Sequence, residues 1–240
     1  MSEIAEIESV KHFLKPHLAN RKITSVILEK EDILINITKD ELLKNLIDKT
    51  IIDFKRRGKI LLFLLDDGST LFIHPRMVGQ LITCLKTLPK IKHTHFIMKF
   101  DNDEEFRYID VRRLGKIYYL KKDEKDDVTG ISKLGYEYDD KNLNEKLLKE
   151  LLDKHNRKSI KEVFLNQSAI AGIGNIYADE ILFDARISPR RKAGYLNNSK
   201  IKRLLSSIRG VLNHYIQVNE SATYDEYLKG EGRYAHIEII

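Results

Sequence analysis

The stretch FLNQSAIAGIGNIYADEILFDARISP, residues 164–189, decides how the second half of the chain folds. After Asn175 its apolar residues recur with helical spacing: Ile176, Ala178, Ile181, Leu182 and Ala185. Gly172 and Gly174 come just before this run, and glycine permits a sharp turn in which the backbone approaches another group closely. The stretch therefore predicts the end of one helix, a glycine-containing turn, and a second helix that begins at Asn175.

The start of this second helix is a candidate anion-binding site. The first amide groups of a helix lack backbone acceptors, and the helix dipole favours a negative charge there. Asn175 adds a side-chain amide that can donate a further hydrogen bond. Basic residues follow the helix, which indicates a nucleic-acid phosphate as the anion; they are Arg186, Arg190, Arg191 and Lys192. A glycine-containing turn taken alone is more often only a turn, so this interpretation depends on the whole string.

The string closely resembles the helix–two-turns–helix signature of the formamidopyrimidine-DNA glycosylase and endonuclease VIII family. The match includes Gln167 and Ser168 and continues without a gap over residues 171–182. The resemblance implies that Asn175 binds a phosphate beside the lesion and that Tyr177 supports the same strand. We place Arg190 with them as a DNA-binding residue.

Composition bounds the remaining possibilities. The chain has 240 residues, 42% hydrophobic and 32% charged, which is typical of a globular protein. A net charge of +6 favours a polyanionic partner without proving one. No apolar run reaches the roughly 18 residues of a membrane helix, and no secretory signal is visible. Cys84 is the single cysteine, which fits a core strand residue and a reducing compartment. We expect a cytoplasmic monomer without a membrane partner.

The amino-terminal residues predict a helix over 2–18 that carries early carboxylates. Glu3, Glu6 and Glu8 would interact favourably with the helix dipole, which is their simplest role. Met1 precedes a small residue, so its removal would leave Ser2 with the free α-amine. An α-amine has a reference pKa of about 7.7–8.0, and the dipole would favour its neutral form. A neutral amine can attack C1′ of a sugar and form a Schiff base.

The segment MSEIAEIE resembles the family's amino terminus, in which a proline follows the methionine. The resemblance implies that residue 2 is the nucleophile, that Glu3 transfers protons, and that Glu6 belongs to the same catalytic set. Here Ser2 replaces the proline. A primary amine can still form an imine, but it lacks proline's fixed φ and secondary nitrogen. The alternative, in which Ser2 is only a terminal residue, stays open.

The next hundred residues predict a β-sandwich, because short apolar segments alternate with turns. The expected strands cover residues 22–29, 33–37, 51–54, 59–65, 69–74, 77–85, 92–100, 105–111 and 115–120, with a short helix over 39–48. Within them, KRRGK at 55–59 resembles the family's RRGKYLL segment, which implies that Lys59 binds a phosphate near the flipped nucleotide. Taken alone, this basic cluster is more simply a solvated turn.

Two further loops resemble family motifs that act on an extruded base. HPRMVG, which begins at His74, resembles HLGMSG, and the resemblance makes His74 a DNA-binding residue and Met77 a wedge. DVRRLG at 110–115 resembles DPRRFG, which implies that Arg112 pairs with the orphaned base and that Leu114 is a second wedge. Extruding a base costs roughly a few kcal/mol of lost stacking. An inserted apolar side chain and a guanidinium offset part of that cost.

The rest of the chain predicts a linker and a helical domain. We expect an α+β protein: a catalytic-type sandwich domain over 1–125, a linker over 126–141, and a helical DNA-binding domain over 142–240. Expected helices cover residues 143–155, 159–166 and 197–217. The family's four-cysteine zinc finger has no counterpart after residue 220, so we expect no zinc finger, no metal and no cofactor. The DNA contact that the finger supplies in the family is then either missing or rebuilt by Arg233 and its neighbours.

Together these features predict a DNA repair glycosylase. It would flip a damaged, oxidised base out of duplex DNA, excise it, and nick the abasic product through an amino-terminal Schiff base. The alternative is a non-catalytic protein that senses DNA damage or structure on the same fold, and the changed residue 2 and the missing zinc finger both favour it. A third possibility is a basic protein without a role on DNA, which would show no salt-sensitive affinity for duplex DNA.

Overall fold

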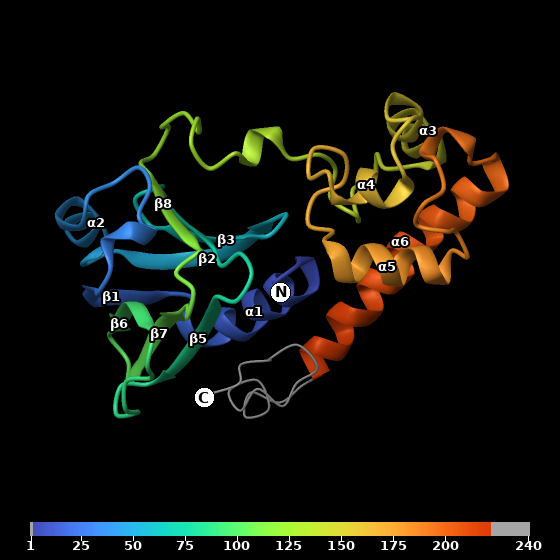
Figure 1. Ribbon diagram of the computed structural model, residues 1–240. Coiled ribbons are helices and arrows are strands. Elements are labelled where there is room, and N and C mark those ends of the chain that lie inside the picture. Colours follow the sequence, from blue (N-terminus) through green and yellow to red (C-terminus); the bar gives the residue numbers. More distant parts are fainter. Residues whose placement is uncertain (1, 222–240) are drawn as a thin grey trace.

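The computed structural model describes residues 2–221, which form a β-sandwich half and a helical half. Helix α1 (Ile4–Leu18) comes first and lies at the junction of the two halves, so the amino end of the chain is also there (Figure 1). The segment after residue 221, including Arg233 and the predicted substitute for the zinc finger, lies outside the described residues.

Two antiparallel sheets make up the first half and share strand β1 (Arg21–Leu28). One sheet has the order β1-β2-β3-β4-β8 and the other β1-β6-β7-β5. The sharing arises because Arg21 and Lys22 pair with β2, whereas residues 23–28 pair with β6. The other strands are β2 (Thr50–Arg57), β3 (Ile60–Leu65), β4 (Thr70–His74), β5 (Gln80–Leu85), β6 (Thr94–Phe100), β7 (Glu104–Ile109) and β8 (Lys116–Leu120).

Aromatic side chains fill the space between the sheets. The ring centroids of Phe63 on β3 and Phe106 on β7 lie 5.1 Å apart in an edge-to-face arrangement, and Phe54 lies 4.9 Å from Phe63. Such pairs contribute beyond their buried area. The predicted β-sandwich is therefore confirmed. Cys84 lies buried in β5, as expected for a small core residue.

One predicted strand is wrong. Residues 33–37 do not form a strand; a short 3-10 helix (Glu31–Ile33) is followed by irregular chain. The reason is visible at the edge of β8, where Asn36 hydrogen-bonds the backbone of Tyr119 with its side-chain amide, at 2.6 Å and 3.1 Å. The Asn36 side chain thus makes the two hydrogen bonds that the backbone of a neighbouring strand would make to Tyr119. Helix α2 (Lys39–Leu46) follows, with a capping box formed by Thr38 and Glu41.

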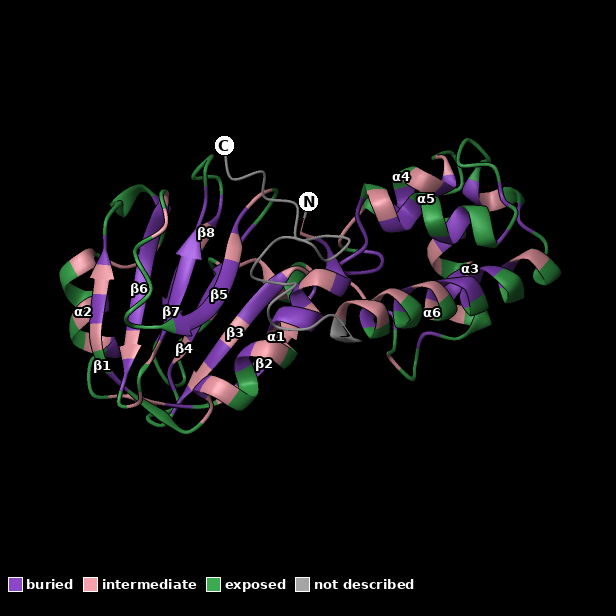
Figure 2. Cartoon of the chain, turned by 90° about the horizontal axis from the view of Figure 1, so that it is seen from below, coloured by how far each residue is buried: buried purple, intermediate pink, exposed green. Residues whose placement is uncertain are grey.

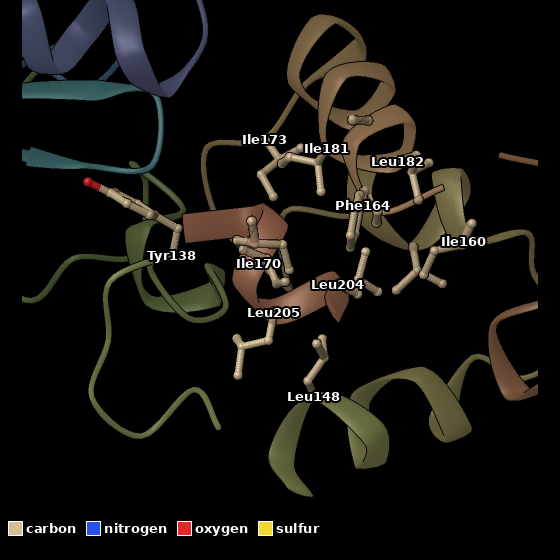
Figure 3. Close-up of a cluster of buried hydrophobic side chains, with 14 of the residues drawn as sticks. Tyr138, Leu148, Ile160, Phe164, Ile170, Ile173, Ile181, Leu182, Leu204 and Leu205 are labelled. Carbon is tan, nitrogen blue, oxygen red and sulfur yellow. The ribbon is translucent and has the colours of Figure 1, made fainter. Parts of the chain in front are cut away.

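Four α-helices build the described part of the second half, which ends at residue 221. They are α3 (Glu145–Lys154), α4 (Ile160–Leu165), α5 (Asn175–Asp184) and the long α6 (Asn198–Ser221). Short 3-10 helices cover Ile131–Lys133 and Ala193–Tyr195. Their apolar faces converge on one core, in which Leu148, Phe164, Ile181 and Leu204 meet (Figure 3). Within residues 2–221, none of the helices is long and apolar enough to cross a membrane.

Helix α1 contributes to both cores. Its first turn, Ile4 and Ala5, is buried among the helical residues, and the amide of Ile4 donates to the carbonyl of Gly172 at 3.2 Å. Its later residues Ile7, Val10, Leu14 and Leu18 are buried in the sandwich. Figure 2 shows the two buried interiors with α1 between them. The division at residues 125 and 141 stays a prediction, since the first helix does not belong to one side alone.

Candidate active site

The carboxylate of Glu3 sits on the amino-terminal amides of α5. Glu3 is fully buried, and its Oε2 accepts hydrogen bonds from the amides of Gly174 at 2.6 Å and Tyr177 at 3.4 Å, while Oε1 accepts from Ile176 at 3.0 Å. Gly174 is required here because a Cβ would lie 2.3 Å from the carboxyl carbon of Glu3. We expected these amides to be free for a phosphate. That expectation is wrong, because the anion at this helix start belongs to the protein itself.

Glu6 lies one helical turn further along α1 and completes the acidic set. Its Oε2 accepts the amide of Glu3 at 2.7 Å, and its Oε1 accepts the Tyr177 hydroxyl at 2.5 Å. Burial raises the pKa of Glu6, although both of these hydrogen bonds act in the opposite direction. Tyr177 itself is fully buried. The predicted contact between Tyr177 and a DNA strand is therefore wrong, because its hydroxyl points at Glu6 rather than outward.

Ser2 lies beside this acidic set and is half-buried. Its Oγ donates to the carbonyl of Gly79 at 3.4 Å, so it also contacts the loop that carries Met77. Ser2 thus contacts the end of the Met77 loop, while its neighbour Glu3 contacts the start of α5. The amino end of the chain and the glycine-containing turn, more than 160 residues apart in sequence, meet at the junction of the two halves.

Lys59 follows the tight turn between β2 and β3, where Gly58 has a positive φ of 54°. The lysine is half-buried, and this burial lowers its pKa, while the charges of Glu3 and Glu6 act to raise it. Its amine therefore shares an electrostatic environment with both carboxylates. The predicted site residues Ser2, Glu3, Glu6 and Lys59 are brought together by the fold.

The neighbouring arginines serve a different purpose from Lys59. Arg56 binds Glu8 of α1 and Glu137, each at 2.6 Å, and its side chain is only 7% exposed. Arg57 binds the other oxygen of Glu137 at 2.6 Å. The basic cluster is thus neither a solvated turn nor a phosphate grip at these two positions. It ties the sandwich to the segment that leads into the helical half.

His74 ends β4 and is held by the following loop. Its Nδ1 accepts the amide of Arg76 at 3.1 Å, which places the ring proton on Nε2. Burial lowers the pKa of His74 to about 4, with the charges of Arg76 and Lys59 acting in the same direction. The imidazole is therefore neutral near pH 7 and can act as a hydrogen-bond donor through Nε2.

The remaining predicted DNA-binding side chains are exposed. Met77 is 44% and Leu114 37% exposed, each on its loop, and Arg112 is exposed beside Leu114. Asn175 is exposed at the first residue of α5, where its side-chain amide has no partner among the described residues. The four basic residues after α5 are exposed as well, and they are Arg186, Arg190, Arg191 and Lys192.

Sequence reasoning missed two structural contributors. Gln167 bridges the two turns, accepting the Gly172 amide at 2.9 Å and donating to the Ile173 carbonyl at 2.7 Å. Its place in the quoted motif was the signal. Glu137 forms ion pairs with both Arg56 and Arg57, and it also accepts the amide of Gly58 at 2.8 Å. No sequence pattern marks that glutamate, because its partners lie some 80 residues earlier.

Comparisons with known proteins agree with this architecture. The Formamidopyrimidine-DNA glycosylase N-terminal domain matches residues 1–117, and the Formamidopyrimidine-DNA glycosylase H2TH domain matches residues 134–226. The formamidopyrimidine-DNA glycosylase of Pelotomaculum thermopropionicum is 38% identical over 234 residues, covering 97% of this chain and 84% of the relative. That of Desulforamulus reducens is 38% identical over 237 residues, with the same coverage.

Solved structures give the same result. Lactococcus lactis Fpg in complex with DNA containing an abasic site has a TM-score of 0.84 and 34% identity, covering 90% of this chain and 79% of that one. The same enzyme with DNA containing Fapy-dG has a TM-score of 0.84 and 32% identity, covering 94% and 86%.

A β-sandwich joined through one shared helix to a helix–two-turns–helix half defines a class of DNA repair enzymes. This chain belongs to the formamidopyrimidine-DNA glycosylase family. It is a DNA glycosylase that excises damaged bases from duplex DNA in base excision repair.

Proposed function

We propose that the α-amine of Ser2, exposed by removal of Met1, is the nucleophile of this glycosylase. The observation that carries the proposal is the binding of Glu3 by three amides of the α5 start, because it fixes the backbone next to residue 2. Preorganised groups of this kind need no rearrangement when the substrate arrives. Ser2 is also half-buried, which leaves it in reach of a substrate at the junction.

The reaction proceeds by displacement at C1′ of the damaged nucleotide. The neutral Ser2 nitrogen attacks C1′, and the electron pair of the C1′–base bond leaves with the base, which takes up a proton. The nitrogen then gives up one proton. Opening of the C1′–O4′ bond, with a proton delivered to O4′, leaves a protonated Schiff base. The lyase step starts from this Schiff base and breaks the strand at the abasic site.

The two glutamates handle these protons. Glu3 is the carboxylate beside the nucleophile, held in a fixed position by the α5 amides, and it accepts a proton and returns it to the sugar. Glu6 lies behind it, joined to Tyr177, and its raised pKa suits a proton reserve. Tyr177 therefore supports the reaction through Glu6 instead of through the DNA.

Side chains around this centre hold the DNA. Asn175, Lys59 and His74 donate to phosphates of the lesion strand, and Arg190 adds long-range attraction for the backbone. Met77 and Leu114 fill the space of the extruded nucleotide, while Arg112 satisfies the orphaned base. Since solved relatives are bound to Fapy-dG and abasic-site DNA, we propose oxidised purines as the substrate class.

We further propose that the enzyme is a cytoplasmic monomer that needs no cofactor. The single cysteine, Cys84, is buried in β5, and a reducing compartment would keep it as a thiol. The domain division remains 1–125, 126–141 and 142–240.

Trapping with borohydride on an abasic duplex tests the nucleophile, since reduction of the Schiff base gives a stable amine. The adduct is expected to map to Ser2 by mass spectrometry, which also establishes the first residue of the purified chain. Ser2→Pro should retain the adduct, because it restores a secondary amine. Ser2→Leu should lose it, because the bulky residue retains Met1 and displaces the amine. An adduct on Lys59 in the wild type would overturn the assignment, as would tight binding with no adduct.

A further inference from the structure

A buried pair, Tyr108 and Asp110, lies beneath both loops that carry the proposed wedges. Both residues are fully buried, and the Tyr108 hydroxyl donates to Asp110 Oδ2 at 2.7 Å. Burial and the neighbouring carboxylate raise the pKa of Tyr108, so its hydroxyl stays protonated and remains a donor. Neither side chain can contact DNA directly, which leaves a supporting role for the pair.

Asp110 organises the loop that carries Arg112 and Leu114. Its Oδ1 accepts the amide of Arg112 at 3.0 Å, and its Oδ2 accepts the amide of Gly115 at 2.9 Å. Its carbonyl accepts the amide of Arg113 at 3.3 Å. One carboxylate thus closes the turn from both ends. The exposed side chains above it project from a backbone that the protein interior holds in place.

The ring of Tyr108 extends this support to the second loop. A Cβ on Gly79 would lie 2.8 Å from Tyr108 Cε2, and one on Gly115 would lie 1.8 Å from the Tyr108 oxygen. Both glycines are therefore packed directly on the tyrosine. Gly79 closes the Met77 loop by donating to the Pro75 carbonyl at 3.1 Å. The same glycine accepts the Ser2 hydroxyl, so the contacts continue to the proposed nucleophile.

We propose that Tyr108 is a positioning residue that couples the two loops, so that Met77 and Arg112 enter the duplex as one unit. The hydroxyl holds the Arg112 loop through Asp110, and the ring holds the Met77 loop through Gly79. The inference rests on the proposed roles of these loops. It predicts that the benefit of each inserted side chain depends on the other, and that this dependence passes through Tyr108.

A double-mutant cycle measures this dependence on the rate of base excision from a lesion duplex. Met77→Ala and Arg112→Ala are made singly and together, first in the wild type and then in Tyr108→Phe. In the wild type, the effect of Met77→Ala should change by at least about 5-fold when Arg112 is also replaced, since coupled neighbours deviate from additivity. In Tyr108→Phe the rate reductions caused by Met77→Ala and Arg112→Ala should simply multiply, so that the coupling factor is about 1.

The control variant is Tyr138→Phe, which also removes a buried hydroxyl bonded at 3.0 Å, to Asn213 in the helical half. Tyr138→Phe should leave the coupling between Met77 and Arg112 unchanged. A general loss of stability should also leave that coupling unchanged. Coupling that persists in Tyr108→Phe would overturn the inference, as would its absence in the wild type. If the Met77→Ala and Arg112→Ala single variants excise as fast as the wild type, the proposed roles of the loops fail instead.

Discussion

Two groups of side chains differ in how many of their hydrogen-bond partners the protein itself supplies. They are the acidic set at the amino terminus and the exposed side chains proposed to bind DNA. Glu3 and Glu6 accept hydrogen bonds from backbone amides at the starts of α1 and α5 and from the Tyr177 hydroxyl. By contrast, Met77, Arg112 and Asn175 project outward from loops and a helix start. The first group is held in place by the protein itself, whereas the second, in its proposed role, finds its partners on the DNA.

The difference separates chemistry from recognition. A carboxylate that must act on a reacting sugar gains from a fixed position and a low-dielectric surrounding. A side chain that must fit a distorted duplex gains from exposure and an unsatisfied polar group. The two groups are therefore expected to fail differently when altered: the first with loss of both stability and rate, the second with loss of DNA binding or base extrusion but no loss of stability.

The largest effect is expected from Glu3→Gln. The amide would set an N–H donor against the amides of α5, and the proton-transfer group would be lost. Base excision should fall about 100-fold or more, and the folded state should lose about 1–3 kcal/mol. Single-turnover excision and urea unfolding measure the two quantities. Glu41→Gln alters the exposed capping box of α2 in the same way and should leave excision unchanged. Full activity in Glu3→Gln would contradict the catalytic assignment.

A smaller, purely recognition effect is expected from Asn175→Ala. Losing one hydrogen bond to a phosphate corresponds to about 1.5 kcal/mol, so Kd for lesion DNA should rise about 10-fold. The unfolding midpoint should stay the same, since the side chain is exposed. Asn198 provides the control, because it is also an exposed first residue of a helix, α6. Equal loss of affinity in Asn175→Ala and Asn198→Ala would remove Asn175 from the DNA contacts.

The smallest effect near pH 7 is expected at His74, because its titration affects stability only in acid. Its folded pKa of about 4 is below the usual value of about 6.5, so the unfolded chain binds the extra proton first. The stability contributed by the neutral ring is complete above about pH 6.5 and is lost as the pH falls towards about 4. His74→Asn should therefore weaken the decline of the unfolding midpoint over this interval relative to the wild type. An identical acid profile for His74→Asn and the wild type would disprove the shift.

Local patterns predicted much of this molecule. Alternating apolar residues and turns predicted the sandwich, and the residue 164–189 stretch predicted the α5 start. Helical spacing also contained a signal that was overlooked: Tyr177 lies four residues before Ile181, on the buried side of α5. What could not be predicted are pairings between distant segments. The occupation of the α5 amides by Glu3 joins positions 171 residues apart, and no local propensity encodes it.

Helix α1 connects the two halves rigidly, because its first turn is buried in the helical half and its later turns are buried in the sandwich. A hinge motion that separated the halves would have to pull Ile4 out of its apolar surroundings, and with it the backbone beside the active nitrogen. Any motion of the two halves must therefore rotate about α1 and leave its contacts with both halves intact. The proposed nucleophile, which directly precedes this helix, would then lie at the pivot of any such motion, where displacement is smallest.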